Sequence, residues 1–183
     1  MKYRKVLPHV VFVLLVGGFV LLSNPSLKQS QTIKSPLTNN RVFPTRETAK
    51  VLKVVDGDTI KVLMNNKEET VRLIGIDSPE VLDERKPVQC FGKEASDKAK
   101  EILTGKTIVL ESDPTQEDKD EYGRLLRYVF LDDLNFNKFM VSEGYAREYT
   151  FKGKSYKQQL EFEDMEGRAL ESKKGLWADN ACN

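Results

Sequence analysis

The stretch Val71-Arg72-Leu73-Ile74-Gly75-Ile76-Asp77-Ser78-Pro79-Glu80 decides how this chain folds. Its apolar and β-branched part is typical of a buried strand, which we expect to span residues 70–76. The strand is followed at once by two carboxylates, Asp77 and Glu80. The stretch therefore predicts a core strand that carries an acidic site at its end.

Two shorter strands are expected before it. The first covers Val51 to Val55 and ends at Asp56-Gly57-Asp58, and the second covers Thr59 to Met64 and ends at a polar turn. Asp-Gly and Asn-Asn pairs favour tight turns between strands. Together with the strand at residues 70–76, these segments predict a three-stranded meander.

The rest of the chain alternates between helical and strand-like patterns. Helices are indicated where apolar residues recur at helical spacing and a glycine follows, and strands where β-branched residues cluster. In order, we expect a helix at 95–105, strands at 107–111 and 125–130, a helix at 135–144 and a helix at 155–173. Five strands with a helix between the third and the fourth predict an α+β, mainly β fold: a five-stranded OB-fold barrel with three helices.

The N-terminal part of the chain does not look globular. Lys2, Arg4 and Lys5 precede an unbroken apolar and glycine run from Val10 to Leu22, which predicts export by a signal peptide or retention by a membrane anchor. Residues 1–22 suit either reading, residues 23–48 suit a flexible linker, and residues 49–183 suit one globular domain. We therefore expect an extracytoplasmic monomer that meets the membrane only through its N-terminal segment.

Composition excludes several kinds of chemistry. The only histidine is His9, so residues 51–183 cannot form a Ser-His-Asp triad or a His-ligated zinc site. Eight of the 29 basic residues but one of the 28 acidic residues lie in residues 1–50, which leaves the remainder with a net charge of −6. Binding of a polyanion would therefore depend on local cations, including a bound metal ion.

The chain has two cysteines, Cys90 and Cys182, which are too few for a cysteine zinc motif. In an exported protein such a pair is typically oxidised, so we expect a disulfide that fastens the polar C-terminal tail. Two unpaired thiols beside a disordered tail are the alternative.

Several motifs together resemble one family. Asp56-Gly57-Asp58-Thr59, the segment from Arg72 to Glu80, Tyr122-Gly123-Arg124 and Gly175-Leu176-Trp177 occur in the order and at the spacing of the staphylococcal nuclease (thermonuclease) family. The resemblance covers about Val51 to Trp177. It implies an OB-fold barrel with three helices and calcium-dependent cleavage of DNA and RNA that leaves 3′-phosphate ends.

The resemblance assigns roles that also make chemical sense. Asp58 and Asp77, supported by the Thr59 carbonyl, would supply the oxygen ligands that Ca²⁺ prefers. Glu80 would act as general base, and Arg72 and Arg124 would grip the phosphate and its developing negative charge. Tyr122 and Tyr149 would contact the substrate. Each residue alone also suits a turn, a packing contact or a surface ion pair, and only the combination favours catalysis.

The chain departs from the family pattern at three places. Ser78 stands where threonine is common, Glu121 replaces a lysine beside the second arginine, and Tyr149 and Phe151 match two pocket tyrosines only loosely. The acidic stretch before Glu121 does not fit an EF-hand, because Val129 falls where a bidentate glutamate is needed. Two other functions remain as alternatives: an OB-fold module that binds nucleic acid without cleaving it, and a structural stalk protein of the cell surface.

Overall fold

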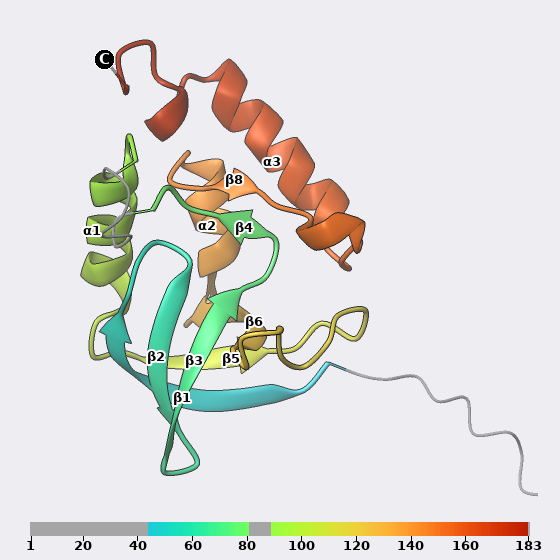
Figure 1. Cartoon of the computed structure of the whole chain (residues 1–183). Coiled ribbons are helices and arrows are strands. Elements are labelled where there is room, and N and C mark those ends of the chain that lie inside the picture. The colour runs from blue at the N-terminus through green and yellow to red at the C-terminus, as the bar shows by residue number, and fades with distance from the viewer. Residues whose placement is uncertain (1–43, 81–88, 183) are drawn as a thin grey trace, which may run out of the picture. The chain divides into compact units, whose positions relative to one another are not determined.

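The computed structural model describes residues 44–80 and 89–182 of the 183-residue chain (Figure 1). The expected signal peptide or anchor at residues 1–22, and the expected linker up to residue 43, lie outside the described residues. Within the described ranges, no helix is long and apolar enough to cross a membrane.

Five main strands form a closed barrel. They are β1 (Arg46–Val54), β2 (Thr59–Met64), β3 (Lys67–Leu73), β5 (Thr107–Glu111) and β6 (Leu125–Leu131). Their order is β3-β2-β1-β5-β6 with antiparallel neighbours, and a parallel pairing of β3 with β6 closes the sheet on itself. The short strand β7 (Leu134–Asn135) pairs antiparallel with the end of β6. The predicted OB-fold barrel is confirmed.

The first strand is longer and less regular than expected. β1 begins at Arg46, before the expected domain start at residue 49, and Arg46 pairs with Glu111 of β5. A bulge between Val51 and Lys53 interrupts its register with β2. Because a bulge adds one residue to the alternation, Val51 and Val54 both face the core, while Leu52 stays 45% exposed.

The expected strand at residues 70–76 is two strands. β3 ends at Leu73, and a separate strand β4 (Ile76–Asp77) pairs with β8 (Arg147–Glu148) in a small second sheet. Gly75 lies between them with φ at +77°, a conformation that favours glycine. A side chain there would also collide with the ring of Tyr156, at 2.7 Å. Residues 70–73 and 76 are in strands as expected, but the turn at Gly75 between them was not predicted.

Three helices accompany the barrel: α1 (Gly92–Leu103), α2 (Phe136–Ser142) and α3 (Gln159–Glu171). Two single turns, η1 (Phe151–Gly153) and η2 (Gly175–Trp177), complete the chain. In Figure 1, α3 lies across α2 and the β4–β8 pair, and α1 flanks the strands. Asn135 caps α2, since its side chain accepts the Lys138 N–H at 3.1 Å.

Helix α3 begins at Gln159 rather than at residue 155, because the residues before it are bonded elsewhere. The Lys157 N–H donates to Asp113 at 2.8 Å, and the Ser155 carbonyl accepts from Gln116 at 2.9 Å. Phe162 of α3 is fully buried and packs edge-on against Tyr156, with ring centroids 5.5 Å apart. These contacts fasten α3 to the barrel.

The two cysteines form a disulfide between the residues before α1 and the C-terminal segment. Cys90 and Cys182 are bonded, with their Cα atoms 5.4 Å apart. The predicted pairing is confirmed, and the alternative of two free thiols is wrong.

Candidate active site

Arg72 is the centre of the candidate site. It lies on β3 opposite Thr59 of β2, a register that sets its side chain against Asp58. Its Nε is 3.3 Å from Asp58 Oδ1, and one terminal nitrogen is 3.0 Å from Asp77 Oδ1. The other terminal nitrogen donates to the carbonyls of Leu73 and Ile76. These contacts hold the guanidinium, whose side chain is 13% exposed, in one orientation.

The turn between β1 and β2 supplies two buried carboxylates. Asp56 and Asp58 are 8% and 5% exposed, and the Asp58 N–H donates to Asp56 Oδ1 at 3.0 Å. Asp58 Oδ2 accepts the Ser78 N–H at 2.7 Å, which joins this turn to the end of β4. Burial, followed by repulsion from Asp58, raises the pKa of Asp56 to about 7.

The Thr59 carbonyl, which the sequence assigned to support a metal ion, takes part in the turn between β1 and β2. It already accepts two backbone hydrogen bonds, from Val55 at 2.9 Å and from Asp56 at 3.3 Å. A carbonyl has two lone pairs, so both are engaged in closing the turn. The Thr59 hydroxyl instead donates to Asp58 Oδ1 at 3.0 Å and orients that carboxylate.

Asp77 lies at the end of β4 on the same side as Arg72. Its side chain is 52% exposed, in contrast to Asp58. Partial burial and repulsion from Asp58 raise the pKa of Asp77, although Arg72 and Arg147 act in the opposite direction. Arg72 therefore contacts both Asp58 and Asp77, and repulsion between these two carboxylates is not fully offset by the nearby arginines.

Glu80 follows this group and is exposed. It lines the same hollow as Arg72 and Asp77. Its backbone is held by Gln89, since the Glu80 N–H donates to Gln89 Oε1 and the Gln89 N–H donates to the Glu80 carbonyl, both at 3.0 Å.

The second arginine is presented by the turn before β6. Asp120 accepts the backbone N–H of Tyr122 and of Arg124 and also the Arg124 Nε, the last at 2.7 Å. Burial opposes ionisation of Asp120, but these donors outweigh it and hold its pKa below the ordinary value. The Arg124 guanidinium lies 5.3 Å from the centre of the Tyr122 ring, and Tyr122 is 76% exposed.

The parallel pairing of β3 with β6 brings the two arginines to one pocket. Arg72 is in register with Leu126, so the turn that carries Arg124 lies beside β3. The pocket has a volume of about 380 Å³. Its lining includes most of the predicted site residues, namely Arg72, Asp77, Glu80, Tyr122, Arg124 and Tyr149. Asp58 does not line it and lies beneath Arg72.

The pocket also contains residues to which the sequence assigned no role or a different one. Lys152 pairs with Glu121 at 3.1 Å, and Lys154 pairs with Glu117 at 3.5 Å. Tyr149 is fixed by its N–H, which donates to the Gly75 carbonyl at 3.1 Å, and its ring contacts Phe151. Lys152 thus brings a cation from another loop to the pocket, where it is paired with Glu121.

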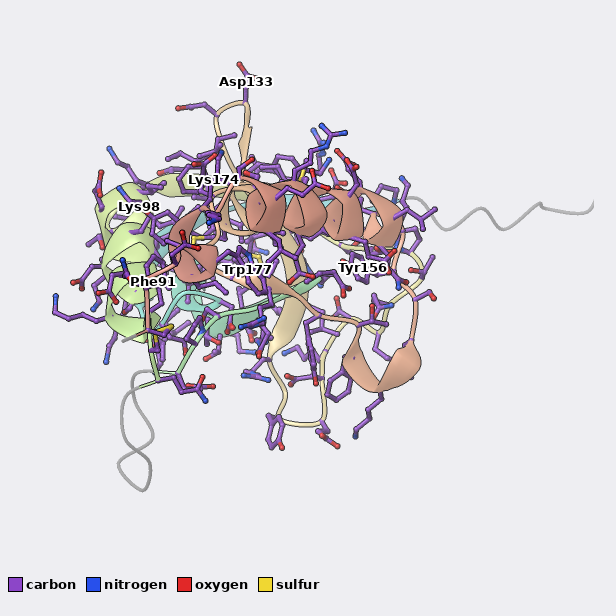
Figure 2. The ribbon with its side chains drawn as sticks, turned by 90° about the horizontal axis from the view of Figure 1, so that it is seen from above. Phe91, Lys98, Asp133, Tyr156, Lys174 and Trp177 are labelled. Atoms are coloured by element: carbon purple, nitrogen blue, oxygen red, sulfur yellow. A yellow bond between two sulfur atoms is a disulfide. The ribbon has the colours of Figure 1, made fainter. Side chains whose placement is uncertain are left out.

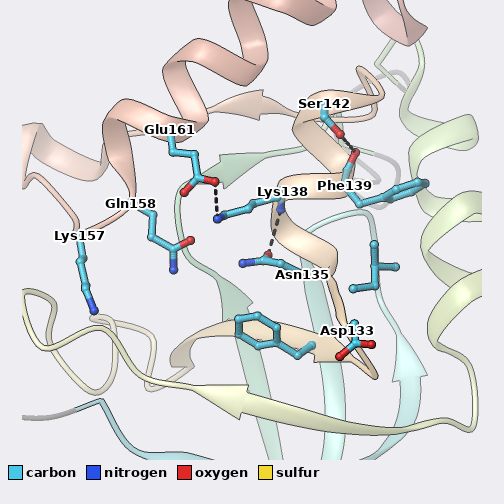
Figure 3. Close-up of a pocket in the computed structure, with 10 residues that line it drawn as sticks. Asp133, Asn135, Lys138, Phe139, Ser142, Lys157, Gln158 and Glu161 are labelled. Atoms are coloured by element: carbon cyan, nitrogen blue, oxygen red, sulfur yellow. Dashed lines mark hydrogen bonds and ion pairs between the residues drawn. The ribbon is translucent and has the colours of Figure 1, made fainter.

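A larger hollow of about 670 Å³ contains none of the predicted residues (Figure 3). It lies between the β6–β7 turn, α2 and the start of α3. Of its charged lining, Lys138 and Glu161 form an ion pair at 2.6 Å. We place the site in the smaller pocket, because that pocket gathers the predicted arginines and carboxylates.

The carboxylate oxygens of Asp58 and Asp77 beside Arg72 are ligands that suit a hard cation. Ca²⁺ binds carboxylate oxygens, and water completes its coordination shell. No three His, Cys, Asp or Glu side chains within residues 44–80 and 89–182 group tightly enough to form a complete metal cage. Beside Asp58, the buried Ser78 hydroxyl has no hydrogen-bond partner in the described part of the chain. The shortage of positive charge at Asp58 and Asp77 thus suits a hydrated, weakly held cation.

Comparison with known proteins agrees with this arrangement. Residues 70–179 match the family model described as "Staphylococcal nuclease homologue". The chain is 37% identical over 167 residues to the thermonuclease of Staphylococcus hyicus, covering 91% of this chain and 95% of that protein. It is 34% identical over 168 residues to the thermonuclease of Staphylococcus intermedius, covering 92% of each. It is also 34% identical over 128 residues to the endonuclease YncB of Bacillus subtilis, covering 69% and 59%.

An OB-fold barrel with two arginines and a group of carboxylates at one pocket is the framework of a nuclease that acts on nucleic acid. The chain belongs to the staphylococcal nuclease family.

Proposed function

We propose that this nuclease hydrolyses phosphodiester bonds of DNA and RNA with the help of calcium and leaves 3′-phosphate ends. The observation that carries the proposal is the pocket lined by Arg72, Asp77, Glu80 and Arg124, with Asp58 in contact with Arg72. These groups supply the three needs of the reaction: a base for water, charge neutralisation at phosphorus, and assistance to the leaving oxygen.

Glu80 is the proposed base. It is exposed at the pocket, where a carboxylate can take a proton from an attacking water molecule. The water oxygen bonds to phosphorus, the bond to the 5′ oxygen breaks, and that oxygen leaves as a hydroxyl by taking a proton from solvent, so the phosphate stays on the 3′ side. Glu80 must be ionised to act as the base.

The two arginines have different surroundings and therefore different parts. Arg72 is 13% exposed and fixed by protein oxygens, so its charge is already in place before the substrate arrives. Arg124 is 31% exposed and held mainly through Nε by Asp120, so its terminal nitrogens can bind phosphate oxygens. Both charges strengthen their hold as negative charge develops in the transition state.

Asp58 and Asp77 would hold the calcium ion, with Ser78 beside them. When bound, the ion supplies positive charge next to the phosphate. Asp56 lies behind this pair and, with its pKa near 7, adds negative potential that depends on pH. Thr59 orients Asp58 through its hydroxyl rather than by offering its carbonyl.

We also propose that the chain works outside the cytoplasm as a monomer. The disulfide between Cys90 and Cys182 supports the location, because such bonds persist in oxidising compartments. The basic start and apolar run of residues 1–22 support export by a signal peptide or an anchor. The proposed chemistry uses residues of one chain and does not require a second copy.

A direct experiment tests the activity. The full chain is incubated with plasmid DNA or RNA, with calcium or with excess chelator, and the product ends are tested for 3′-phosphate. Calcium-dependent cleavage to 3′-phosphate supports the proposal. Binding without cleavage under every condition would instead favour an OB-fold module that only binds nucleic acid.

A further inference from the structure

Gln89 holds the main chain of Glu80 from both sides. Its side-chain oxygen accepts the Glu80 N–H and its own N–H donates to the Glu80 carbonyl, each at 3.0 Å. The two peptide groups that flank the Glu80 Cα atom are thus fixed by one residue. Main-chain orientation sets the direction in which a side chain leaves the backbone, so Gln89 fixes the direction of the Glu80 Cα–Cβ bond.

The start of α1 packs closely on the same segment. A Cβ atom added to Gly92 would lie 2.9 Å from the Glu80 carbonyl oxygen and 3.0 Å from that of Pro79. The Gly92 N–H also donates to the Gln89 carbonyl at 3.0 Å, which makes residues 89–92 one turn. Only glycine permits this approach, and it leaves the Glu80 backbone little room to move.

The turn is itself tethered at two points. The neighbouring Cys90 is bonded to Cys182, and the ring of Phe91 packs on Tyr145 with centroids 5.7 Å apart (Figure 2, where Phe91 is labelled). The C-terminal segment that carries Cys182 is anchored in turn, since the Leu176 N–H donates to the Gly144 carbonyl at 2.9 Å. The disulfide therefore connects Gln89 to a fixed part of the fold.

We infer that Gln89 is a positioning residue for Glu80, and that the Cys90–Cys182 disulfide keeps Gln89 in place so that turnover depends on this bond. The inference rests on the proposed function, in which Glu80 is the base. A general base must lie within hydrogen-bond reach of its proton, and small misplacements cost large factors in rate. A residue that fixes the base without touching substrate acts on turnover rather than on binding.

Reduction gives a direct means of releasing the tether. A dithiol such as dithiothreitol supplies two electrons and two protons, the S–S bond becomes two thiols, and the dithiol closes to a cyclic disulfide. Cys90 and Cys182 are both exposed, so the reagent can reach them. The contact between Phe91 and Tyr145 remains after reduction, and the loss of turnover is therefore partial.

The first test replaces Gln89 in the full chain. Gln89→Met keeps the side-chain length and removes the acceptor, and it should lower kcat about tenfold with KM changed less than about twofold. Gln89→Glu restores an acceptor oxygen and should recover most of kcat. Its added negative charge should shift the acid limb of the kcat profile to higher pH. Gln159→Met is the matched control, because Gln159 bonds only Glu163 on the exposed side of α3.

The second test concerns the disulfide. Cys182→Ser and the reduced wild-type chain should each lose about threefold or more in kcat at a temperature where both remain folded, and reoxidation should restore only the wild type. Dithiothreitol should leave Cys182→Ser unchanged. A lower melting temperature with unchanged kcat would show that the bond only stabilises the fold and would overturn its part in positioning.

The Glu80→Gln variant distinguishes the proposed role of Glu80 as base from the proposed role of Gln89 in positioning it. If it keeps wild-type turnover, the proposed role of Glu80 fails. If it is inactive while Gln89→Met turns over normally, the proposed function stands and the positioning role of Gln89 is overturned. A loss of kcat in Glu80→Gln and Gln89→Met, with recovery in Gln89→Glu, supports both.

Discussion

The hydroxyl of Tyr128 on β6 donates a 2.6 Å hydrogen bond to Asp113, a carboxylate that also accepts the Lys157 N–H at 2.8 Å just before α3. Asp113 is 3% exposed and lies in the loop after β5. One side chain thus joins the barrel wall to the residues just before the C-terminal helix.

Removing this hydroxyl should weaken the fold without affecting catalysis. Tyr128→Phe leaves Asp113 one donor short in a buried place, and we expect the free energy of unfolding to fall by about 2 kcal/mol. Denaturant unfolding of the variant and the wild type measures the difference. Tyr122→Phe is the control, because Tyr122 is 76% exposed and should change stability little. Equal stability of Tyr128→Phe and wild type would contradict the role given to the bond.

Asp113 should also make stability depend on acid pH. Burial opposes its ionisation, but hydrogen bonds from Tyr128, Thr115 and Lys157 outweigh burial and hold its pKa below the ordinary 3.8. A carboxyl group whose pKa is lower in the folded state contributes its full stabilisation at any pH above its pKa in the unfolded state. This contribution is lost as the pH falls from 3.8 through the folded pKa. Unfolding curves over that range should show a smaller loss for Tyr128→Phe than for wild type.

Loss of either proposed catalytic group should strongly lower turnover and leave the fold intact. Arg72→Ala removes the fixed charge beside the phosphate, and Glu80→Gln removes the base, so each should lower kcat by about a hundredfold or more. Steady-state cleavage of an oligonucleotide with calcium present measures the effect. Arg168→Ala, which breaks an exposed pair with Asp164 on α3, serves as control. Wild-type turnover in either site variant would refute the assignment.

Glu121 should weaken substrate binding by occupying Lys152. Both side chains are exposed and 3.1 Å apart at the pocket, so Glu121→Gln frees a cation for the phosphate backbone. We expect KM to fall about threefold at low salt, with kcat nearly unchanged and the advantage lost at high salt. Glu143→Gln, which breaks another exposed pair, with Lys174, should leave KM as it was. The idea fails if the two variants behave alike.

Calcium should stabilise the folded chain through Asp77. A ligand that binds only the folded state raises the melting temperature, and we expect millimolar calcium to do so in the wild type. Asp77→Asn should abolish the rise. In chelator, however, Asp77→Asn should melt no lower than wild type, because the neutral side chain at position 77 no longer repels the negative charge of Asp58. An undiminished calcium effect in Asp77→Asn would move the ion away from this pair.

The fold could be predicted because its strands and helices have strong local signals. β-branched runs broken by Asp-Gly and Asn-Asn gave β2, and the glycine after Leu103 marked the end of α1. The turn at Gly75 and the bulge in β1 were missed, because each depends on contacts with Tyr156 or with β2 that a local pattern does not contain. The late start of α3 has the same origin, since Asp113 engages the Lys157 N–H.

The site was less predictable than the fold. Arg72, Arg124 and Glu80 could be found from their motifs, and the pocket joins all three. The role of the Thr59 carbonyl could not be judged from sequence, because it depends on two backbone donors in the turn. Gln89 and Lys152 were missed because they come from segments without a recognisable motif and act through partners distant in sequence. Asp56 was visible in the Asp-Gly-Asp motif, but only its burial reveals its raised pKa.

The parallel ladder between β3 and β6 determines when the chain becomes dangerous to nucleic acid. Arg72 and Arg124 reach one pocket only after residues 71–73 have paired with residues 125–127. A chain that is still being synthesised, or is held extended, has both arginines but no common grip on a phosphate. The unfolded chain should therefore have no nuclease activity until the pairing of β3 with β6 closes the barrel.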